Sequence, residues 1–163
     1  MLHGSLVSAG TDRLTGAGRS GTPQMVAPGA SDILDLAGWQ EIPVHFRDRA
    51  CHPHNRLIKS VAFNAEERAA LAREIVDRLA GATGPTQYFL PRQGIEEWDK
   101  PGAPAHEPEG LAAFVTASEA AAEGRVPLTA LDCHINDDAF CAAVLAQLDT
   151  WIAEGVVPPG KPG

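Results

Sequence analysis

Short apolar runs alternate with helical patterns along this chain. Runs at residues 5–8, 24–27, 57–63, 86–90 and 127–132 have the length of strands, and a helical pattern comes after most of them. Strands that alternate with helices at this spacing are typical of a parallel sheet with right-handed crossovers. The pattern predicts an α/β fold, doubly wound and Rossmann-like with three layers, whose mainly parallel sheet has about five strands and helices on both faces.

Helix starts are marked by capping signals. Asn64 and Glu67 have the spacing of a capping box, and an apolar stripe follows them. Pro108 suits the first turn of a second helix, and Asp137 is a natural N-cap for a third. A brief helix is expected after Thr11 and another over residues 31–36.

Size and charge narrow the class of protein. At 163 residues we expect one domain, residues 1–155, followed by a disordered Pro- and Gly-rich tail, residues 156–163. The net charge of −8 and the absence of a basic run argue against nucleic acid or an anionic membrane as a partner. An odd count of three cysteines and the lack of an apolar signal segment favour the cytoplasm.

A polar rim is predicted where the strands end. Ligands of open α/β sheets bind beyond the carboxyl ends of the strands, where glycine turns expose backbone N–H groups to anions. Arg92 is the cation expected to pair with an anionic or phosphorylated ligand there. The residues predicted to bind the ligand on this basis are Ser8, Gly10, Thr11, Asp12, Gly29, Ser31, Asp32, Arg92, Gly94, Asn136 and Asp137.

The end of the last strand carries the candidate catalytic pair. Asp132 and His134 are two positions apart on a strand, so they point to the same side. His134 could act as general acid or base with Asp132 orienting it. In the alternative interpretation Asp137 caps the helix, Asp132 accepts backbone N–H bonds and His134 fills the loop.

Other motifs are weak. Asp132, His134 and Asp137 could ligate a metal, but no thiolate or paired-histidine set accompanies them, so no dedicated metal is predicted. The chain has no P-loop, and Gly16, Gly18 and Gly21 match a dinucleotide fingerprint only in spacing, at a helix end. The patch at residues 51–55 precedes its strand, which would place it away from the rim.

Several short motifs, in this order and spacing, resemble the carboxyl-terminal half of the Tm-one-like ATP-binding proteins, an uncharacterised family named after a plant antiviral resistance protein. The motifs are Ser-Ala-Gly-Thr-Asp-Arg at 8–13, Pro-Gly-Ala-Ser-Asp at 28–32, His54-Asn55, Leu-Pro-Arg-Gln-Gly at 90–94, Asp-Lys-Pro-Gly-Ala-Pro at 99–104, Glu107-Pro108 and Asp-Cys-His-Ile-Asn-Asp at 132–137. The resemblance adds His54 and Asn55 to the predicted ligand-binding residues.

The resemblance implies ATP, with Mg²⁺, as a ligand and a two-lobed architecture in which this chain is the carboxyl-terminal lobe. The implied partners are an amino-terminal lobe of the same family or a second copy of the chain, and a barrel protein resembling phosphoenolpyruvate-handling enzymes. The start at a strand is then explained by truncation, a split gene or a shortened chain.

Three functions remain open. The chain could be the ligand-binding lobe of an ATP-binding protein that holds a nucleotide or another small anion. It could instead be a hydrolase or transferase that acts on a small phosphorylated or carboxylated substrate through His134 and Asp132. Finally, it could be a lobe that serves only in assembly, through apolar surface on its first strand.

Overall fold

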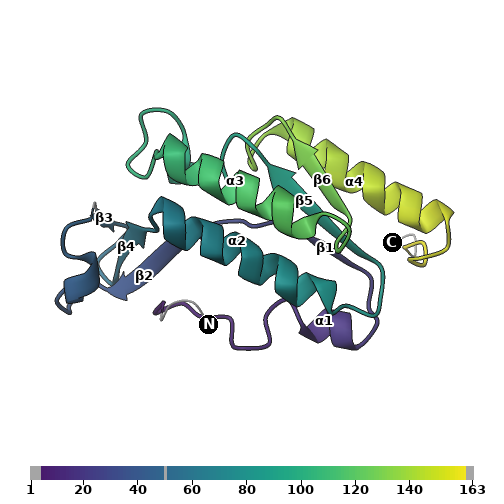
Figure 1. The fold of residues 1–163 in the computed structure, drawn as a ribbon, viewed down its shortest axis with the longest axis horizontal. Coiled ribbons are helices and arrows are strands. Elements are labelled where there is room, and N and C mark those ends of the chain that lie inside the picture. Colours follow the sequence, from purple (N-terminus) through teal and green to yellow (C-terminus); the bar gives the residue numbers. More distant parts are fainter. Residues whose placement is uncertain (1–4, 50, 161–163) are drawn as a thin grey trace.

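The computed structural model describes residues 5–49 and 51–160, and within them two three-stranded sheets form. The first sheet is parallel, in the order β1-β5-β6, and the second is antiparallel, in the order β2-β4-β3 (Figure 1). Their bounds are β1 Gln24–Val26, β5 Thr86–Pro91, β6 Leu128–Leu131, β2 Ile33–Ala37, β4 Ile58–Ala62 and β3 Cys51–Pro53.

Helices connect and cover the strands. The α-helices are α1 Gly16–Arg19, α2 Ala65–Ala80, α3 Pro108–Ala122 and α4 Asp138–Ala153, and the short 3-10 helices are η1 Val44–Phe46 and η2 Glu97–Asp99. The predicted capping box is confirmed, because the Asn64 side chain accepts from Glu67 N and the Glu67 carboxylate accepts from Asn64 N. None of the helices in the described residues is long and apolar enough to cross a membrane.

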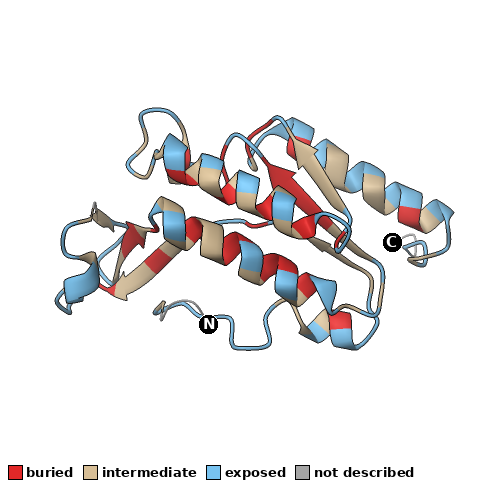
Figure 2. Cartoon of the chain, viewed as in Figure 1, coloured by how far each residue is buried: buried red, intermediate tan, exposed pale blue. Residues whose placement is uncertain are grey.

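β5 is the centre of the core and packs on both faces. Tyr88 and Leu90 belong to the main buried cluster, which contains the inner faces of α2 and α3. Phe89 points the other way and meets Phe140 of α4, with 6.4 Å between ring centroids. Buried residues accordingly gather on β5 and on the sheet-facing sides of α2 and α3 (Figure 2). Helices therefore cover both faces of the parallel sheet, as predicted.

The α/β class is confirmed, with differences in strand number and pairing. The parallel sheet has three strands rather than about five, because β2, β3 and β4 form a separate antiparallel sheet. The helix expected at residues 31–36 is wrong: β2 lies there and pairs with β4 from Ile33↔Ala62 to Ala37↔Ile58. Pairing with β4 outweighs the capping signal of Ser31, since Ile33, Leu34 and Leu36 also suit a strand.

The amino-terminal segment also differs from its prediction. Residues 5–8 form no strand, although Leu6 N donates to Asp35 O at 2.7 Å and so runs beside β2. Helix α1 begins at Gly16 rather than near Thr11, after a series of turns. At the other end Val156 N and Val157 N donate to Trp151 O, and residues 161–163 of the predicted tail lie outside the described residues.

Candidate functional site

Loops from the carboxyl ends of all three parallel strands meet at one edge of the sheet. Backbone bonds join them: Ala30 N donates to Ile95 O at 2.9 Å, and Ile135 N donates to Gly94 O at 3.0 Å. The loop after β5 is thus held between the loops after β1 and β6. This is the edge at which open α/β sheets place their ligands.

His134 is buried at this edge and hydrogen-bonded through both ring nitrogens. Its Nε2 lies 2.9 Å from both Asp99 Oδ1 and the carbonyl oxygen of Glu96, and its Nδ1 accepts from Asn136 N at 3.1 Å. The acceptor role of Nδ1 assigns the ring proton of a neutral imidazole to Nε2. His134 therefore joins the loop after β6 to the loop after β5 instead of presenting a free nitrogen to solvent.

Gly94 leaves room for the contact between the side chains of His134 and Asp99. Its φ of +138° lies in a region that favours glycine, and a Cβ built on it would overlap both Asp99 and His134. Asp99 in turn accepts backbone N–H bonds from Ile95 at 2.5 Å and from Glu96 at 3.3 Å. The predicted ligand residue Gly94 thus has a structural role: it admits the buried His134–Asp99 contact.

A second buried contact joins Asp32 to Arg68 of α2. Arg68 Nη2 lies 3.2 Å from Asp32 Oδ2, and both side chains are closed off from solvent. Arg68 Nε donates to Phe63 O, whereas neither carboxylate oxygen of Asp32 has a hydrogen-bond partner among the described residues. Burial raises the pKa of Asp32, and the positive charge of Arg68 opposes that rise.

Glu96 is the carboxyl group at this edge whose protonation changes near neutral pH. Burial raises its pKa to about 7, and the nearby charges of Asp32 and Asp99 act in the same direction. Its Oε2 accepts from Trp98 N at 2.7 Å, while no partner for Oε1 is present in the described part of the chain. A carboxyl with such a pKa can hold or release a proton at physiological pH.

The first of two adjoining pockets, here called the Gly10 pocket, has a volume of about 460 Å³. It lies between the segment at residues 5–14, the loop after β1 and helix α2. Arg78 of α2 donates to Thr11 O and Arg13 O, which holds this segment against the helix. Its wall combines the apolar side chains of Leu71 and Ile75 with turns, hydroxyl groups and Arg13.

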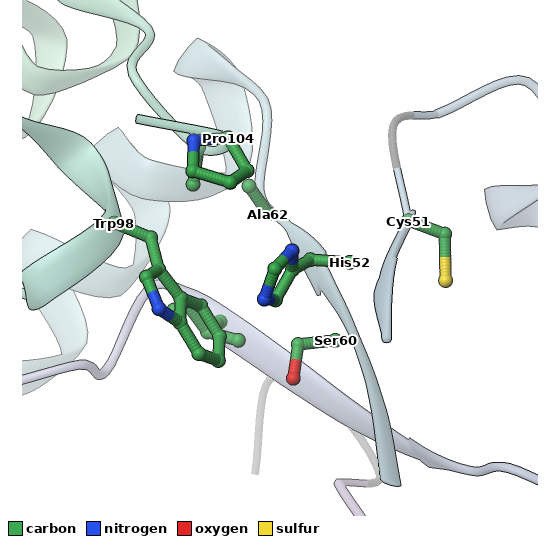
Figure 3. Close-up of a pocket in the computed structure, with 8 residues that line it drawn as sticks. Cys51, His52, Ser60, Ala62, Trp98 and Pro104 are labelled. Atoms are coloured by element: carbon green, nitrogen blue, oxygen red, sulfur yellow. The ribbon is translucent and has the colours of Figure 1, made fainter. Parts of the chain in front are cut away.

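The second, the Trp98 pocket, has a volume of about 590 Å³ and shares Gly29, Ala30, Ile33 and Asp35 with the first. Trp98 of η2 packs against His54, with 5.2 Å between ring centroids, and against His52, with 4.3 Å between ring centroids. Figure 3 shows the ring of His52 beside the indole of Trp98, where both line a smaller cavity together with Ser60. Trp98 therefore contacts two histidines at the edge of the antiparallel sheet, His52 in β3 and His54 just after it.

The structure brings many predicted ligand residues together in these pockets. The Gly10 pocket contains Ser8, Gly10, Thr11, Gly29 and Ser31, and the Trp98 pocket contains Gly29, His54 and Asn136. The patch at residues 51–55 was expected away from the rim, and this is corrected for His54, which lines the Trp98 pocket together with Asn136.

Other predicted residues lie apart from the pockets. Arg92 is exposed and bound by Glu119 at 2.5 Å and by Asp132 at 3.2 Å, and these hydrogen bonds raise its pKa. Asp132 is likewise exposed, and Asp99 rather than Asp132 contacts the ring of His134. The expected geometry of the Asp132–His134 pair is therefore corrected, while its catalytic role stays a prediction.

Three further predicted residues stabilise loops. Asn55 Oδ1 accepts from Leu57 N and Ile58 N, and Asp137 Oδ2 accepts from His134 N at 2.8 Å. Asp137 precedes α4 as predicted, but its side chain bonds this loop rather than the helix N–H groups. Asp12 O accepts from Thr15 N at 3.0 Å, which closes the turn before α1.

Sequence reasoning missed Arg13, Arg68, Glu96, Trp98 and Asp99. A signal was present for Arg68, which precedes Leu71 and Ala72 by three and four positions and so continues the apolar stripe of its helix. A charge on such a stripe indicates a buried partner. No group of three or more His, Cys, Asp or Glu residues that could hold a metal ion occurs in residues 5–49 and 51–160.

Comparison with known proteins identifies relatives of the chain. Residues 1–152 match the C-terminal domain of an uncharacterised protein family, UPF0261. A UPF0261 protein of Brucella melitensis is 45% identical over 158 residues, which are 97% of this chain and 38% of that relative. One from Clostridium tetani is 30% identical over 146 residues, 89% of this chain and 36% of the relative.

A plant protein is similar at greater distance. The ToMV resistance protein Tm-1(GCR237) of Solanum lycopersicum is 26% identical over 125 residues, which are 76% of this chain and 17% of that protein. The chain thus spans well under half the length of each of these relatives.

Proposed function

Because this chain belongs to the UPF0261 family, whose members are uncharacterised, we propose its function from its geometry: it is a ligand-binding lobe that holds a nucleotide or another small anion in the Gly10 pocket. The observation that carries this proposal is the composition of that pocket at the carboxyl edge of β1. ATP with Mg²⁺ is the first ligand to test, since the sequence motifs resemble those of ATP-binding proteins.

The Gly10 pocket offers groups that suit phosphate. Gly10 has a φ of +91°, the kind of turn in which consecutive backbone N–H groups can converge on an anion. Ser8 and Thr11 supply hydroxyl groups, and the exposed guanidinium of Arg13 supplies a positive charge. Leu71 and Ile75 form an apolar wall for a base or ribose, as is usual in small-molecule sites.

Isothermal titration of ATP with Mg²⁺ into the purified chain tests this proposal. We expect Arg13→Ala to weaken binding by about ten-fold, the effect of losing one charge-assisted contact. Arg73→Ala is the matched control: Arg73 is also exposed, lies on α2 and lines neither pocket, so affinity should not change. Equal losses of affinity in both variants would show that only the net charge of the chain matters, and would overturn the assignment to the Gly10 pocket.

The same titration should be repeated after mixing the chain with the unmatched part of the Brucella relative. Binding by the chain alone places the nucleotide on this lobe. Binding only in the mixture makes the Gly10 pocket half of a split site, and no binding in either case refutes the proposal.

A role in assembly is the second candidate, favoured by apolar surface beside the Gly10 pocket. Leu6 and Val7 are 50% and 62% exposed, and Val7 lines the pocket. An amino-terminal lobe or a second copy that covered these side chains would also close the pocket. Light scattering tests this: a chain that remains monomeric at high concentration, with and without the other lobe, would contradict it.

A further inference from the structure

The Trp98 pocket differs from the Gly10 pocket in charge. Apart from His54, its ionisable residues are the acids Asp35, Glu96 and Glu97, and no Lys or Arg is among its lining residues in the part of the chain that the structure describes. Such a wall repels phosphate and carboxylate groups and attracts cations. The Gly10 pocket, by contrast, is lined by Arg13 and Arg78 as well as by Asp35 and Glu74. A ligand group that enters the Trp98 pocket should therefore be cationic, whereas the Gly10 pocket also offers positive charge to an anion.

Two of these carboxyl groups, those of Asp35 and Glu96, each have one oxygen without a hydrogen-bond partner among the described residues. Asp35 Oδ1 accepts from Ser60 Oγ at 2.6 Å, and no hydrogen bond to its Oδ2 occurs within the described residues. Glu96 is only 5% exposed, and its Oε1 has no hydrogen-bond partner among the described residues. A buried carboxylate oxygen without a partner costs free energy that a nearby positive charge would offset.

The third carboxylate is already neutralised. Both oxygens of Glu97 lie within 3.0 Å of Lys100 Nζ, and Asn136 Nδ2 donates to Oε2 at 2.8 Å. These bonds lower the pKa of Glu97. Glu97 and Asn136 therefore brace the edge of the pocket, while Asp35 and Glu96 remain to meet a ligand.

Trp98 adds an aromatic surface beside these carboxyl groups. The backbone N–H of Trp98 donates to Glu96 Oε2 at the start of η2. This hydrogen bond keeps the carboxyl group of Glu96 close to the residue that carries the indole. Contact with His52 and His54 orients the ring from the antiparallel sheet. A cation over an indole face is attracted by the ring quadrupole, and Trp is the strongest of the aromatic side chains in this respect.

We propose that the Trp98 pocket is a binding subsite for an organic ammonium group, which packs on the indole of Trp98 and takes Asp35 and Glu96 as its counter-ions. This inference stands independently of the nucleotide proposed for the Gly10 pocket. Because the two pockets share Gly29, Ala30, Ile33 and Asp35, a ligand with an anionic and a cationic end could occupy both.

Choline chloride is the probe, and dimethylbutanol, which has the same shape without the charge, is its control. The chain contains three tryptophans, so the indole N–H signals in an ¹⁵N spectrum are few, and Trp98→Phe assigns the signal of Trp98. At about pH 8, where Glu96 with its pKa of about 7 is mostly ionised, we expect choline to shift that signal saturably, with at least about ten-fold higher affinity than dimethylbutanol. Equal affinity of the two probes, or no shift with choline, would overturn the proposal.

Asp35→Asn tests the proposed counter-ion. The amide oxygen can still accept from Ser60, so the variant removes the charge and keeps the hydrogen bond. We expect choline to bind about five-fold more weakly, because the lost charge is negative. Asp149→Asn on the exposed side of α4 is the matched control and should leave the affinity for choline unchanged. If Asp35→Asn leaves choline binding intact, Asp35 is not the counter-ion and the proposal fails.

Discussion

His134 Nε2 lies 2.9 Å from Asp99 Oδ1, and both side chains are shielded from solvent by the loops that they connect. Asp99 comes from η2 and His134 from the segment between β6 and α4, 35 positions apart in the sequence. Their contact joins two of the loops at the carboxyl edge of the sheet. Since residues of both loops line the Trp98 pocket, the shape of that pocket should depend on this contact.

Removing the imidazole should therefore act on stability. We expect His134→Ala to lower the free energy of unfolding by about 3 kcal/mol, because it leaves the buried carboxylate of Asp99 without this partner. Asp132→Ala should change it by less than about 0.5 kcal/mol, because Asp132 is exposed. Urea unfolding measures both values. A similar small effect in both variants would show that the His134–Asp99 contact contributes little.

Gly94→Ala should disturb the same contact from the backbone. The added Cβ would overlap His134 and Asp99 at a φ that side chains rarely adopt, so we expect a loss of more than about 2 kcal/mol. Gly102→Ala is the control, since its φ of +84° is also positive but a Cβ there would meet open space. It should cost about 1 kcal/mol. Thermal unfolding of the two variants provides the comparison, and equal shifts in Tm would argue against crowding at Gly94.

Arg68→Ala should be strongly destabilising, by about 3–5 kcal/mol, since it would leave Asp32 buried without its cation. Arg73→Ala, at an exposed position of the same helix, should have almost no effect. Replacing Asp32 and Arg68 together by Leu and Met should recover much of the loss, because no charge then remains buried. A double replacement as unstable as Arg68→Ala would contradict this account; denaturant titration of each variant distinguishes the outcomes.

Glu96 should make stability fall as pH rises through neutrality. Its pKa rises from 4.5 to about 7 in the folded chain, where burial, Asp32 and Asp99 disfavour the charge and Arg68 favours it. The folded state therefore binds the proton more tightly, and this stabilisation is fully present below about pH 4.5 and lost as pH rises through about 7.

The expected loss between those pH values is at most about 3 kcal/mol relative to Glu96→Gln, which keeps the side chain neutral. The control is Glu109→Gln, at an exposed position of α3, which should retain the wild-type pH dependence. Unfolding curves at several pH values supply the test. If Glu96→Gln follows the wild-type curve, another group is responsible for the pH dependence.

Local signals in the sequence predicted much of the fold. The capping box at Asn64 and Glu67, the strand at Gln24–Val26 and the helix that begins at Pro108 depend on neighbouring residues, so they could be read in order along the chain. The strand at residues 33–37 could not be predicted in this way, because pairing with β4, which lies farther along the chain, decides between helix and strand there. Gly29, Ser31 and Asn136 were also expected at one edge, and they lie there because the loops after parallel strands meet by topology, while their role in binding stays a prediction.

The sequence by itself determined the α/β class, the starts of α2, α3 and α4, and the glycine- and hydroxyl-rich segments that became the Gly10 pocket. These features follow from short-range periodicity and capping, whose physics extends over a few residues. Only the tertiary structure decided that Asp99 rather than Asp132 meets His134, that Arg68 meets Asp32, and that Arg92 is bound by Glu119. Charge pairing depends on distances of a few ångströms between side chains far apart in sequence, and the packing of the loops sets those distances.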